Sequence, residues 1–323
     1  MGNAYINLGR YDEALEAFEK AKNYTIDEDL QVKLLYAEGR TYELINSPES
    51  IQKFNEALRK MPNPASNDLY LAALYHLGCC QAKYNLYNDS IDSFSRIIDA
   101  DCNDKCVYEE RGKAYLKNEM FEKALRDFEV VAGIDENYSE IYYCRGMSKI
   151  YMGNDYMIEE ALKDFFKAIE LGSRHVAIYN GISCAYLQAK KYEKALIYSN
   201  ICLNTHPHTE EFLVQRSLIY LELEEYEKSI EDLTTALGVN NRNLIIYYRR
   251  GLAFYKNKDY EKAIEDLEKS LKLLPNRNIQ ADIFYHIGIA YSNLEKHVEA
   301  IEPLTRAILL EPKPKYFHER AKC

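Results

Sequence analysis

The 323-residue sequence contains no tryptophan, and glycine and proline are scarce. With 13 Gly and 8 Pro, and with 47% hydrophobic and 28% charged residues, the composition excludes a collagen-like chain and favours a folded protein over a disordered one. Basic residues are also in deficit, since 41 Lys and Arg oppose 51 Asp and Glu for a formal net charge of −10. We therefore expect no nucleic-acid partner, because the phosphate backbone selects basic surfaces.

Long hydrophobic runs are missing as well. Uncharged apolar runs such as residues 307–310 are only a few residues long, whereas about 18 are needed to cross a bilayer, so we expect no membrane insertion. The first residues, MGNAYINLGR, lack the basic start and apolar core of a secretory signal, and the eight cysteines show no disulfide-framework spacing. These features predict a reducing, cytoplasmic compartment.

The sequence does contain an internal repeat that covers nearly the whole chain. Similar segments recur at spacings of 34 to 39 residues, and each copy is numbered so that one small residue is position 8. Within a copy, apolar residues recur at helical spacing, as Tyr247, Gly251 and Phe254 do, which predicts two short amphipathic helices per copy. The position-8 residues are Gly2, Gly39, Gly78, Gly112, Gly146, Ser183, Ser217, Gly251 and Gly288.

Two further positions indicate how the helices pack. Position 20 is small in all nine copies, and position 24 is Phe in the first five copies but Ser or Leu in the last four. Only small residues let two helix backbones approach closely where they cross, and larger residues fill the remaining space. We therefore expect a bulkier core in the N-terminal half. Position 20 is Ala14, Ser50, Ser90, Ala124, Ala161, Ala195, Ser229, Ala263 and Ala300; position 24 is Phe18, Phe54, Phe94, Phe128, Phe165, Ser199, Leu233, Leu267 and Leu304.

This pattern resembles the tetratricopeptide repeat (TPR), in which small residues and an aromatic residue mark the first helix and Ala, Phe and Ala mark the second. The resemblance implies an all-α fold, a right-handed α-solenoid (superhelix) of helix-turn-helix repeats of about 34 residues. Residues 1–323 are expected to form a single array of about eight full repeats with partial repeats at both ends. Copies are expected to start near residues 1, 32, 71, 105, 139, 176, 210, 244 and 281, with a partial helix from about 314.

The resemblance also implies a concave groove lined by the first helices. Position 5 is Tyr in five of eight copies, and a ladder of tyrosines suits the capture of a peptide or helix because each ring offers area and a hydroxyl. Packing between neighbouring helices is an alternative role for the same rings. The predicted partner-binding residues are Tyr36, Tyr75, Tyr143, Tyr151, Asn180, Tyr248, Tyr255, Tyr285, Arg40, Lys113 and Arg249.

Two ligand-binding patterns known in the family are missing from this groove. One subfamily clamps the acidic tails of heat-shock chaperones with Lys, Asn and Arg, but Ala37, Ala72 and His76 stand at three of the clamp positions. Ala or His cannot replace those side chains in carboxylate recognition, so a chaperone-cofactor role is disfavoured. The asparagine ladder of another subfamily is absent too.

Catalytic and metal-binding motifs are weak or missing. The sequence has no Gly-rich phosphate loop, HExxH, GxSxG or kinase signature, so we expect neither enzyme activity nor a cofactor. Asp99, Asp101, Asn103 and Glu110 imitate a calcium-binding EF-hand loop, but Asp104 stands where that loop requires Gly. A solvated turn between two copies explains the same residues, and no metal is expected.

The sequence therefore predicts a non-catalytic scaffold or adaptor that binds protein partners within a larger assembly. A calcium-linked or otherwise regulated sensor and the adaptor region of a longer enzyme are the alternatives. The cysteines, the many Asn and Tyr residues and the irregular insertions resemble eukaryotic members of the family, including those of cytoskeletal or ciliary assemblies.

Overall fold

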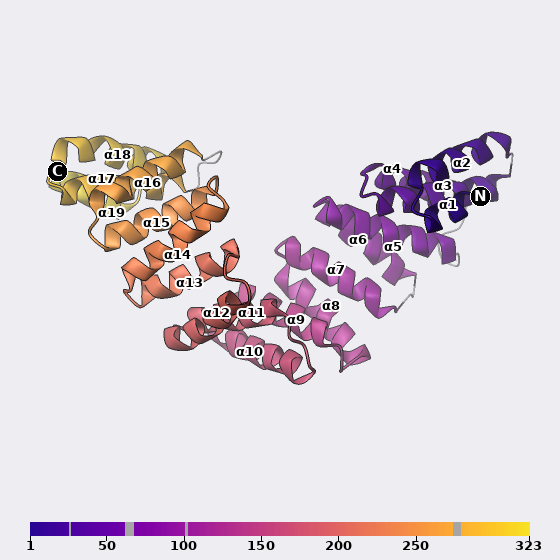
Figure 1. Ribbon diagram of the computed structural model, residues 1–323, viewed down its shortest axis with the longest axis horizontal. Helices are drawn as coiled ribbons and strands as arrows, with labels where there is room; N and C mark the ends of the chain where they lie inside the picture. Colours follow the sequence, from indigo (N-terminus) through magenta and orange to yellow (C-terminus); the bar gives the residue numbers. More distant parts are fainter. Residues whose placement is uncertain (26, 62–67, 101–102, 274–278) are drawn as a thin grey trace. The chain divides into compact units, whose positions relative to one another are not determined.

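The computed structural model describes residues 1–25, 27–61, 68–100, 103–273 and 279–323, which form 19 helices and no β-strand (Figure 1). The expected all-α solenoid of helical repeats is thereby confirmed. The helices are α1 (Gly2–Asn7), α2 (Tyr11–Tyr24), α3 (Glu28–Leu44), α4 (Glu49–Lys60), α5 (Asp68–Lys83), α6 (Tyr87–Asp99), α7 (Lys105–Lys117), α8 (Phe121–Ile134), α9 (Ser139–Met152), α10 (Asp155–Glu170), α11 (Val176–Gln188), α12 (Tyr192–Thr205), α13 (Glu210–Glu222), α14 (Tyr226–Val239), α15 (Leu244–Lys256), α16 (Tyr260–Lys272), α17 (Gln280–Asn293), α18 (His297–Leu310) and α19 (Pro314–Lys322).

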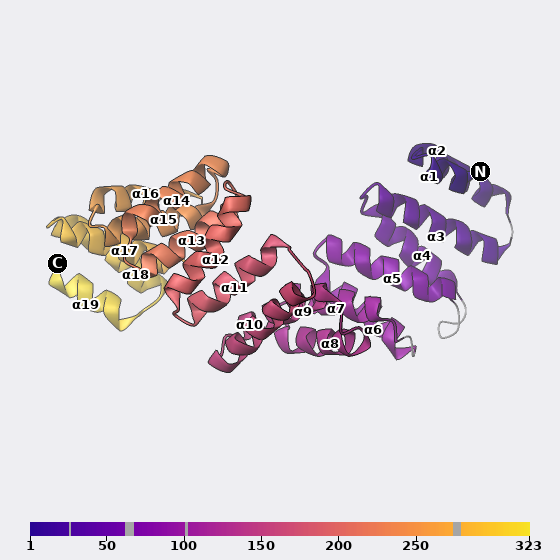
Figure 2. The same ribbon diagram turned by 60° about the horizontal axis from the view of Figure 1, so that its bottom comes forward.

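The helices fall into two compact units. Unit 1 (Met1–Ser173) holds α1 to α10, and unit 2 (Arg174–Cys323) holds α11 to α19. In each unit every odd-numbered first helix packs against the even-numbered second helix that follows it, and first helices of successive copies, such as α5 and α7 or α15 and α17, also contact each other. In Figure 2 the short α19 lies beside α18 at the C-terminal end of unit 2. Within a unit, the first helices therefore share one face.

Most first helices lie where the repeat register predicts them. The observed α7 and α9 cover residues 105–117 and 139–152, as expected from the repeat. Helix α3 differs, because the register predicts its start near residue 32 and it begins at Glu28. The side chain of Asp27 caps this longer helix by accepting a hydrogen bond from the backbone N–H of Asp29 at 3.1 Å, and the acidic first turn complements the helix dipole.

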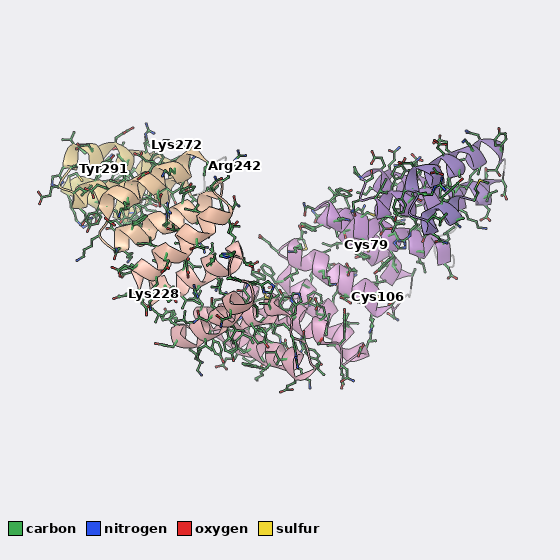
Figure 3. The ribbon with its side chains drawn as sticks, viewed as in Figure 1. Cys79, Cys106, Lys228, Arg242, Lys272 and Tyr291 are labelled. Atoms are coloured by element: carbon green, nitrogen blue, oxygen red, sulfur yellow. The ribbon has the colours of Figure 1, made fainter. Side chains whose placement is uncertain are left out.

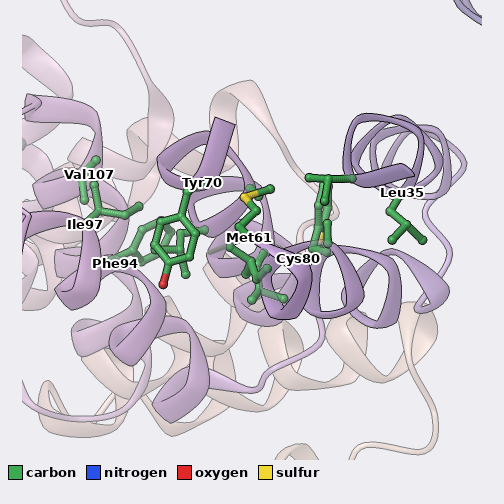
Figure 4. Close-up of a cluster of buried hydrophobic side chains, with 14 residues drawn as sticks. Leu35, Met61, Tyr70, Cys80, Phe94, Ile97 and Val107 are labelled. Carbon is green, nitrogen blue, oxygen red and sulfur yellow. The ribbon is translucent and has the colours of Figure 1, made fainter. Parts of the chain in front are cut away.

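The two helices of a copy cross closely at the position-8 glycine. A Cβ atom added to Gly39 would lie 2.8 Å from Cε1 of Phe54, and one added to Gly251 would lie 2.8 Å from Cγ of Leu267. The position-24 side chain thus fills the space above the glycine, and all five of the N-terminal phenylalanines at this position are buried. Figure 4 shows Phe94 within the resulting core between α3 and α7.

The turn that joins the two helices has a left-handed residue at position 15 in all nine copies. Its φ lies between 56° and 73°, although only Gly9 and Gly153 are glycines. In the copy that contains Glu119, the N–H of Met120 donates to the carbonyl of Tyr115 at 2.9 Å, which is the hydrogen bond of a Schellman cap. The position-15 residues are Gly9, Asn46, Asn85, Glu119, Gly153, Lys190, Glu224, Lys258 and Glu295.

A buried ion pair recurs between position 7 and position 23, the residues directly before positions 8 and 24. Nε of Arg250 lies 2.6 Å from Oδ2 of Asp266 and its Nη2 lies 3.0 Å from Oδ1, while Nη1 donates to Oγ1 of Thr234 on the preceding second helix at 3.1 Å. The bidentate pair therefore joins both helices of its copy to the copy before it. The pairs of this kind are Arg111–Asp127, Arg145–Asp164, Arg216–Asp232 and Arg250–Asp266, and the second copy carries a charge-reversed pair, Glu38–Lys53.

An aromatic ring at position 4, at position 11 or at both flanks each of these arginines. The guanidinium carbon of Arg250 lies 5.8 Å from the ring centroid of Tyr247 and 5.7 Å from that of Phe254. Arrangements of this geometry add a cation–π attraction to the ion pair. We use the term arginine rung for a position-7 arginine together with its position-23 aspartate. The term includes the aromatic ring or rings that flank the arginine and, where present, its contact on the preceding second helix.

Candidate functional site

The predicted groove residues of unit 1 include an aromatic cluster on α3 and α5. The ring of His76 lies 6.1 Å from that of Tyr36 and 5.6 Å from that of Tyr75. Both tyrosines also contact core phenylalanines, since the rings of Tyr36 and Phe54, and those of Tyr75 and Phe94, are 5.9 Å apart. The two tyrosines are half-buried. They therefore help to pack the first helices and still present part of each ring on the surface.

Arg40 lies beside this cluster and is engaged within the chain. Its Nη1 atom lies 2.9 Å from Nε2 of His76 and 2.8 Å from Oε2 of Glu43. Burial acts to raise the pKa of Glu43, but the hydrogen bonds and charges of His76 and Arg40 outweigh burial and hold that pKa below its usual value. A partner carboxylate would have to compete with Glu43 for Arg40.

Lys113 is also neutralised inside unit 1. Its Nζ atom lies 2.6 Å from Oε1 of Glu109 and 3.0 Å from Oε1 of Glu110, and Tyr138 donates to Glu109 at 2.9 Å. Burial acts to lower the pKa of Lys113, but the two carboxylates outweigh it and raise the pKa. This cation therefore stabilises the buried Glu109 in the free protein.

The other two predicted tyrosines of unit 1 lie on α9. The ring of Tyr143 is 6.2 Å from that of Phe165, and Tyr151 stacks on Phe121 with ring centroids 5.2 Å apart. Tyr143 is half-buried, whereas Tyr151 is 54% exposed. The stacked pair on α8 and α9 is the more accessible of the two aromatic contacts.

Three predicted tyrosines of unit 2 converge on one histidine of α17. The ring centroid of His286 lies 5.2 Å from that of Tyr285, 6.0 Å from that of Tyr255 and 6.5 Å from that of Tyr248. We call these four residues the tyrosine cluster. Burial lowers the pKa of His286 to about 4, so its imidazole is neutral near pH 7. In the described part of the chain, Nδ1 of His286 is buried and has no hydrogen-bond partner.

Helix α19, which forms at the expected partial repeat, covers one side of the tyrosine cluster. Tyr316 is fully buried, its ring lies 4.9 Å from that of Tyr285, and its hydroxyl donates to Oδ1 of Asp282 at 2.6 Å. Nζ of Lys315 lies 4.7 Å from the ring centroid of Tyr285. Tyr285 is therefore partly occupied by contacts within the chain, and Tyr248 and Tyr255 lie on the neighbouring α15.

The last two predicted residues, Asn180 and Arg249, are half-buried residues of unit 2. Asn180 donates from Nδ2 to Oε1 of Glu211 at 3.1 Å. Burial lowers the pKa of Arg249. Of the three predicted groove cations, Arg249 is the one without a hydrogen bond or ion pair to any described residue. Its guanidinium therefore has no acidic partner within the described residues.

The EF-hand-like residues are only partly described, because Asp101 lies outside the described residues. Asp99 is the last residue of α6, Asn103 accepts a hydrogen bond from the hydroxyl of Tyr108 at 3.1 Å, and Glu110 is paired with Lys113. Over the described ranges, no three or more His, Cys, Asp or Glu side chains are grouped so as to hold a metal ion. No helix in those ranges is both long enough and apolar enough to cross a membrane.

Sequence reasoning missed the arginine rungs and the buried site of His286. A signal for the rungs was present, because Arg directly before position 8 is accompanied by Asp directly before position 24 in every copy that has it. The signal for His286 was weaker, since one histidine among tyrosines does not indicate burial.

Comparison with known proteins identifies the class to which these helical repeats belong. Models described as tetratricopeptide repeat match residues 1–25, 210–243, 245–277 and 281–314. A TPR repeat-containing protein of Methanocaldococcus jannaschii is 24% identical over 225 residues, which cover 64% of this chain and 37% of the relative. These segments of the chain are thus similar to tetratricopeptide repeats, and the chain spans little more than a third of that relative's length.

Solved structures show the same fold. A tetratricopeptide repeat protein from Parabacteroides merdae superposes with a TM-score of 0.66 at 20% identity, covering 80% of this chain and 98% of its own. A chain of the APC/C hetero-tetramer Cut9–Hcn1 superposes with a TM-score of 0.59 at 13% identity, covering 99% of this chain and 82% of its own.

Proposed function

We propose that this protein is a scaffold that holds a protein partner on the first-helix face, with the tyrosine cluster of unit 2 as its main contact. The observation that supports this proposal is the convergence of Tyr248, Tyr255 and Tyr285 on the neutral imidazole of His286. Half-buried aromatic rings offer a large contact area at a low cost in side-chain entropy, and such rings dominate many protein interfaces.

Arg249 suits the polar part of the same contact. Its charge acts on Tyr248, and it lacks an ion pair within the described ranges. A partially desolvated arginine gains more from a carboxylate than an exposed one does, since water screens the pair less. We therefore propose that the bound segment combines apolar side chains with at least one Asp, Glu or C-terminal carboxylate.

The test is a quantitative affinity purification from the source cells with three forms of the protein. The Tyr248→Ala, Tyr285→Ala double variant should lose at least about tenfold of the main partner, because truncated aromatic anchors each cost roughly 1–2 kcal/mol or more. The matched control replaces Tyr24 and Tyr156, which are 89% and 67% exposed on the second helices α2 and α10.

Both variants must keep the native circular dichroism spectrum, so that loss of the partner is not due to unfolding. Equal partner recovery with the cluster variant and the control would contradict the proposal and would place the binding surface elsewhere. Loss of the partner from Arg249→Gln alone would identify the carboxylate contact.

We also propose that the array works in a reducing, cytoplasmic compartment as one part of a larger assembly. All seven described cysteines are free, and burial raises the pKa of the Cys144 and Cys184 thiols to about 12. Such thiols resist oxidation because the reactive thiolate is scarce. Cell fractionation followed by mass spectrometry of the intact assembly tests both points. A eukaryotic, cytoskeletal or ciliary setting stays a prediction.

A further inference from the structure

The ninth copy keeps the surroundings of an arginine rung but has no arginine. Its position-4 and position-11 rings are Phe284 and Tyr291, in the places of Tyr247 and Phe254 in the eighth copy. Position 7, however, is Ile287 instead of Arg, and position 23 is Pro303 instead of Asp. The charged core of the rung is therefore missing while the residues that would flank it remain.

The third and sixth copies, which also lack the arginine, fill its place with their own side chains. In the third copy, Oγ of Ser93 donates to Oε1 of Gln81 at 2.7 Å. In the sixth copy, the position-23 residue Tyr198 stacks on the position-11 ring of Tyr186 with centroids 5.7 Å apart. Pro303 of the ninth copy has a short side chain, which cannot reach the position-11 ring of Tyr291 in the same way.

An open pocket of about 530 Å³ lies at this place between α16, α17 and α18. Phe284, Ile287, Tyr291 and Pro303 line it together with residues of the two flanking second helices. Figure 3 labels two lining residues, Tyr291 of α17 and Lys272 of α16, near the C-terminal end of unit 2. The volume exceeds that of one long side chain, so a partner residue can enter without displacing a helix.

The rim of the pocket is acidic. Glu268 occupies the place that Thr234 holds in the eighth copy, where the rung arginine donates its third hydrogen bond. Glu299 also lies on the rim, and within the described ranges neither Glu268 nor Glu299 forms an ion pair. Burial, followed by the charges of Glu268, Glu299 and Glu302, raises the pKa of Tyr291.

Two basic residues, Lys272 and Arg306, line the pocket beside the three glutamates. Arg306 pairs with Oε1 of Glu302 at 2.5 Å, and its guanidinium carbon lies 5.4 Å from the ring centroid of Phe284. Arg306 thus covers one ring and neutralises one carboxylate. Tyr291 has no cation over its ring among the described residues, and the carboxylate of Glu268 is open beside it.

We propose that this pocket binds an arginine side chain of a protein partner, in the way that the other copies hold their own. The guanidinium would lie over Tyr291 and pair with Glu268, and an apolar neighbour in the partner would cover Val298, which is 81% exposed on the rim. The pocket is formed by the second helices and the outer edge of α17. Failure of this proposal would therefore leave the tyrosine cluster, on the first-helix face, untouched.

The experiment titrates the isotope-labelled full chain with a nine-residue Gly/Ser peptide that carries a central Val-Arg pair. Two further peptides replace Arg by citrulline, its neutral isostere, or by Lys. We expect amide shifts confined to α16, α17 and α18, with at least tenfold weaker binding of the citrulline peptide and measurably weaker binding of the Lys peptide, because Lys cannot form the planar, bidentate contact.

Two variants test the site itself. Glu268→Gln should weaken binding of the arginine peptide at least threefold, while the matched control Glu265→Gln on the same helix, whose carboxylate pairs with Lys269, should leave binding unchanged. Ile287→Arg combined with Pro303→Asp rebuilds the rung of the eighth copy and should abolish peptide binding. If that double variant does not fold, the Glu268→Gln result decides.

Several results would overturn the proposal. Equal affinity for the arginine and citrulline peptides would show that the pocket does not recognise the charged guanidinium. Shifts outside α16 to α18 would place the peptide elsewhere. Concentration-dependent self-association that protects the amides around Tyr291 would identify a second copy of the chain as the occupant instead.

Discussion

The Asp266→Ala substitution should destabilise the eighth copy far more than the loss of a surface ion pair would. Asp266 is 2% exposed and receives two hydrogen bonds from Arg250, whose own side chain is 16% exposed. Removing the carboxylate leaves the guanidinium buried between two aromatic rings with Thr234 as its remaining hydrogen-bond acceptor. Breaking a buried pair in this way typically costs about 3–5 kcal/mol, whereas exposed pairs contribute about 0–1 kcal/mol.

The assay is urea unfolding followed by circular dichroism, combined with native-state hydrogen exchange read copy by copy. Exchange should rise first in α13 to α18, because repeat arrays couple mainly to their neighbours. Glu261→Ala, an exposed residue at the start of α16, serves as the control and should change the unfolding free energy by less than about 0.5 kcal/mol.

A double substitution separates two free energies: the cost of leaving one buried charge unpaired, and the net contribution of the ion pair to stability. Arg250→Ile with Asp266→Leu replaces the rung by apolar side chains, as position 7 of the ninth copy does naturally, and should recover most of the lost stability. The reasoning would be refuted if Asp266→Ala cost less than about 1 kcal/mol, or if the double variant were no more stable than the single one.

Two further predictions concern packing and pH. Ala195→Leu, at a fully buried helix crossing, should cost about 1–3 kcal/mol by overpacking and raise hydrogen exchange in the sixth and seventh copies first; equal loss of protection along the whole chain would contradict it. Because the pKa of His286 is about 4 in the folded chain and about 6.5 in the unfolded chain, the unfolded state binds more protons between these values. The free energy of unfolding should therefore fall as the pH drops from about 6.5 to 4, by up to about 3 kcal/mol, and urea unfolding of His286→Phe should show a clearly smaller pH dependence.

The sequence predicted the fold because helix packing depends on residue size, which a single sequence displays. Small residues at positions 8 and 20 and large ones at position 24 recur at a fixed spacing, and the structure places Phe54 and Leu267 directly over their glycines. The start of α3 was missed because the repeat pattern marks where helices cross and not where they begin. Its first turn depends on the local cap at Asp27, which lies five residues before the expected start of the copy, whereas the cap of α7, Asp104, directly precedes it.

The turn within each copy was harder to recognise, because its residue types do not repeat from copy to copy. Its left-handed residue is Gly in two copies and Asn in two, but Lys or Glu in the other five. Lys and Glu have no preference for positive φ, so these five residues give no local signal. The cap hydrogen bonds and the packing of both helices impose the conformation in these copies.

The candidate site was predicted in part, since chain position sets which residues face the first-helix surface but not what each one contacts there. Arg40 and Lys113 were expected to be groove cations, yet nearby carboxylates engage both. Ion pairs of this kind depend on side-chain reach between helices, which the repeat register does not specify. Arg249 has no acidic neighbour at the equivalent places and stays open.

The distribution of charge at positions 7 and 23 connects stability with recognition in this array. An unpaired buried charge is costly, so a copy can lose a rung only by losing both charges together, and copies with Leu77, Ile182 or Ile287 at position 7 have no acid at position 23. The residue that replaces the acid then decides whether the space is filled. Tyr198 refills it, whereas Pro303 leaves it open beside Tyr291 and Glu268. The same requirement for paired charge that stabilises the copies with rungs thus leaves, in the ninth copy, a pocket whose missing component is a guanidinium.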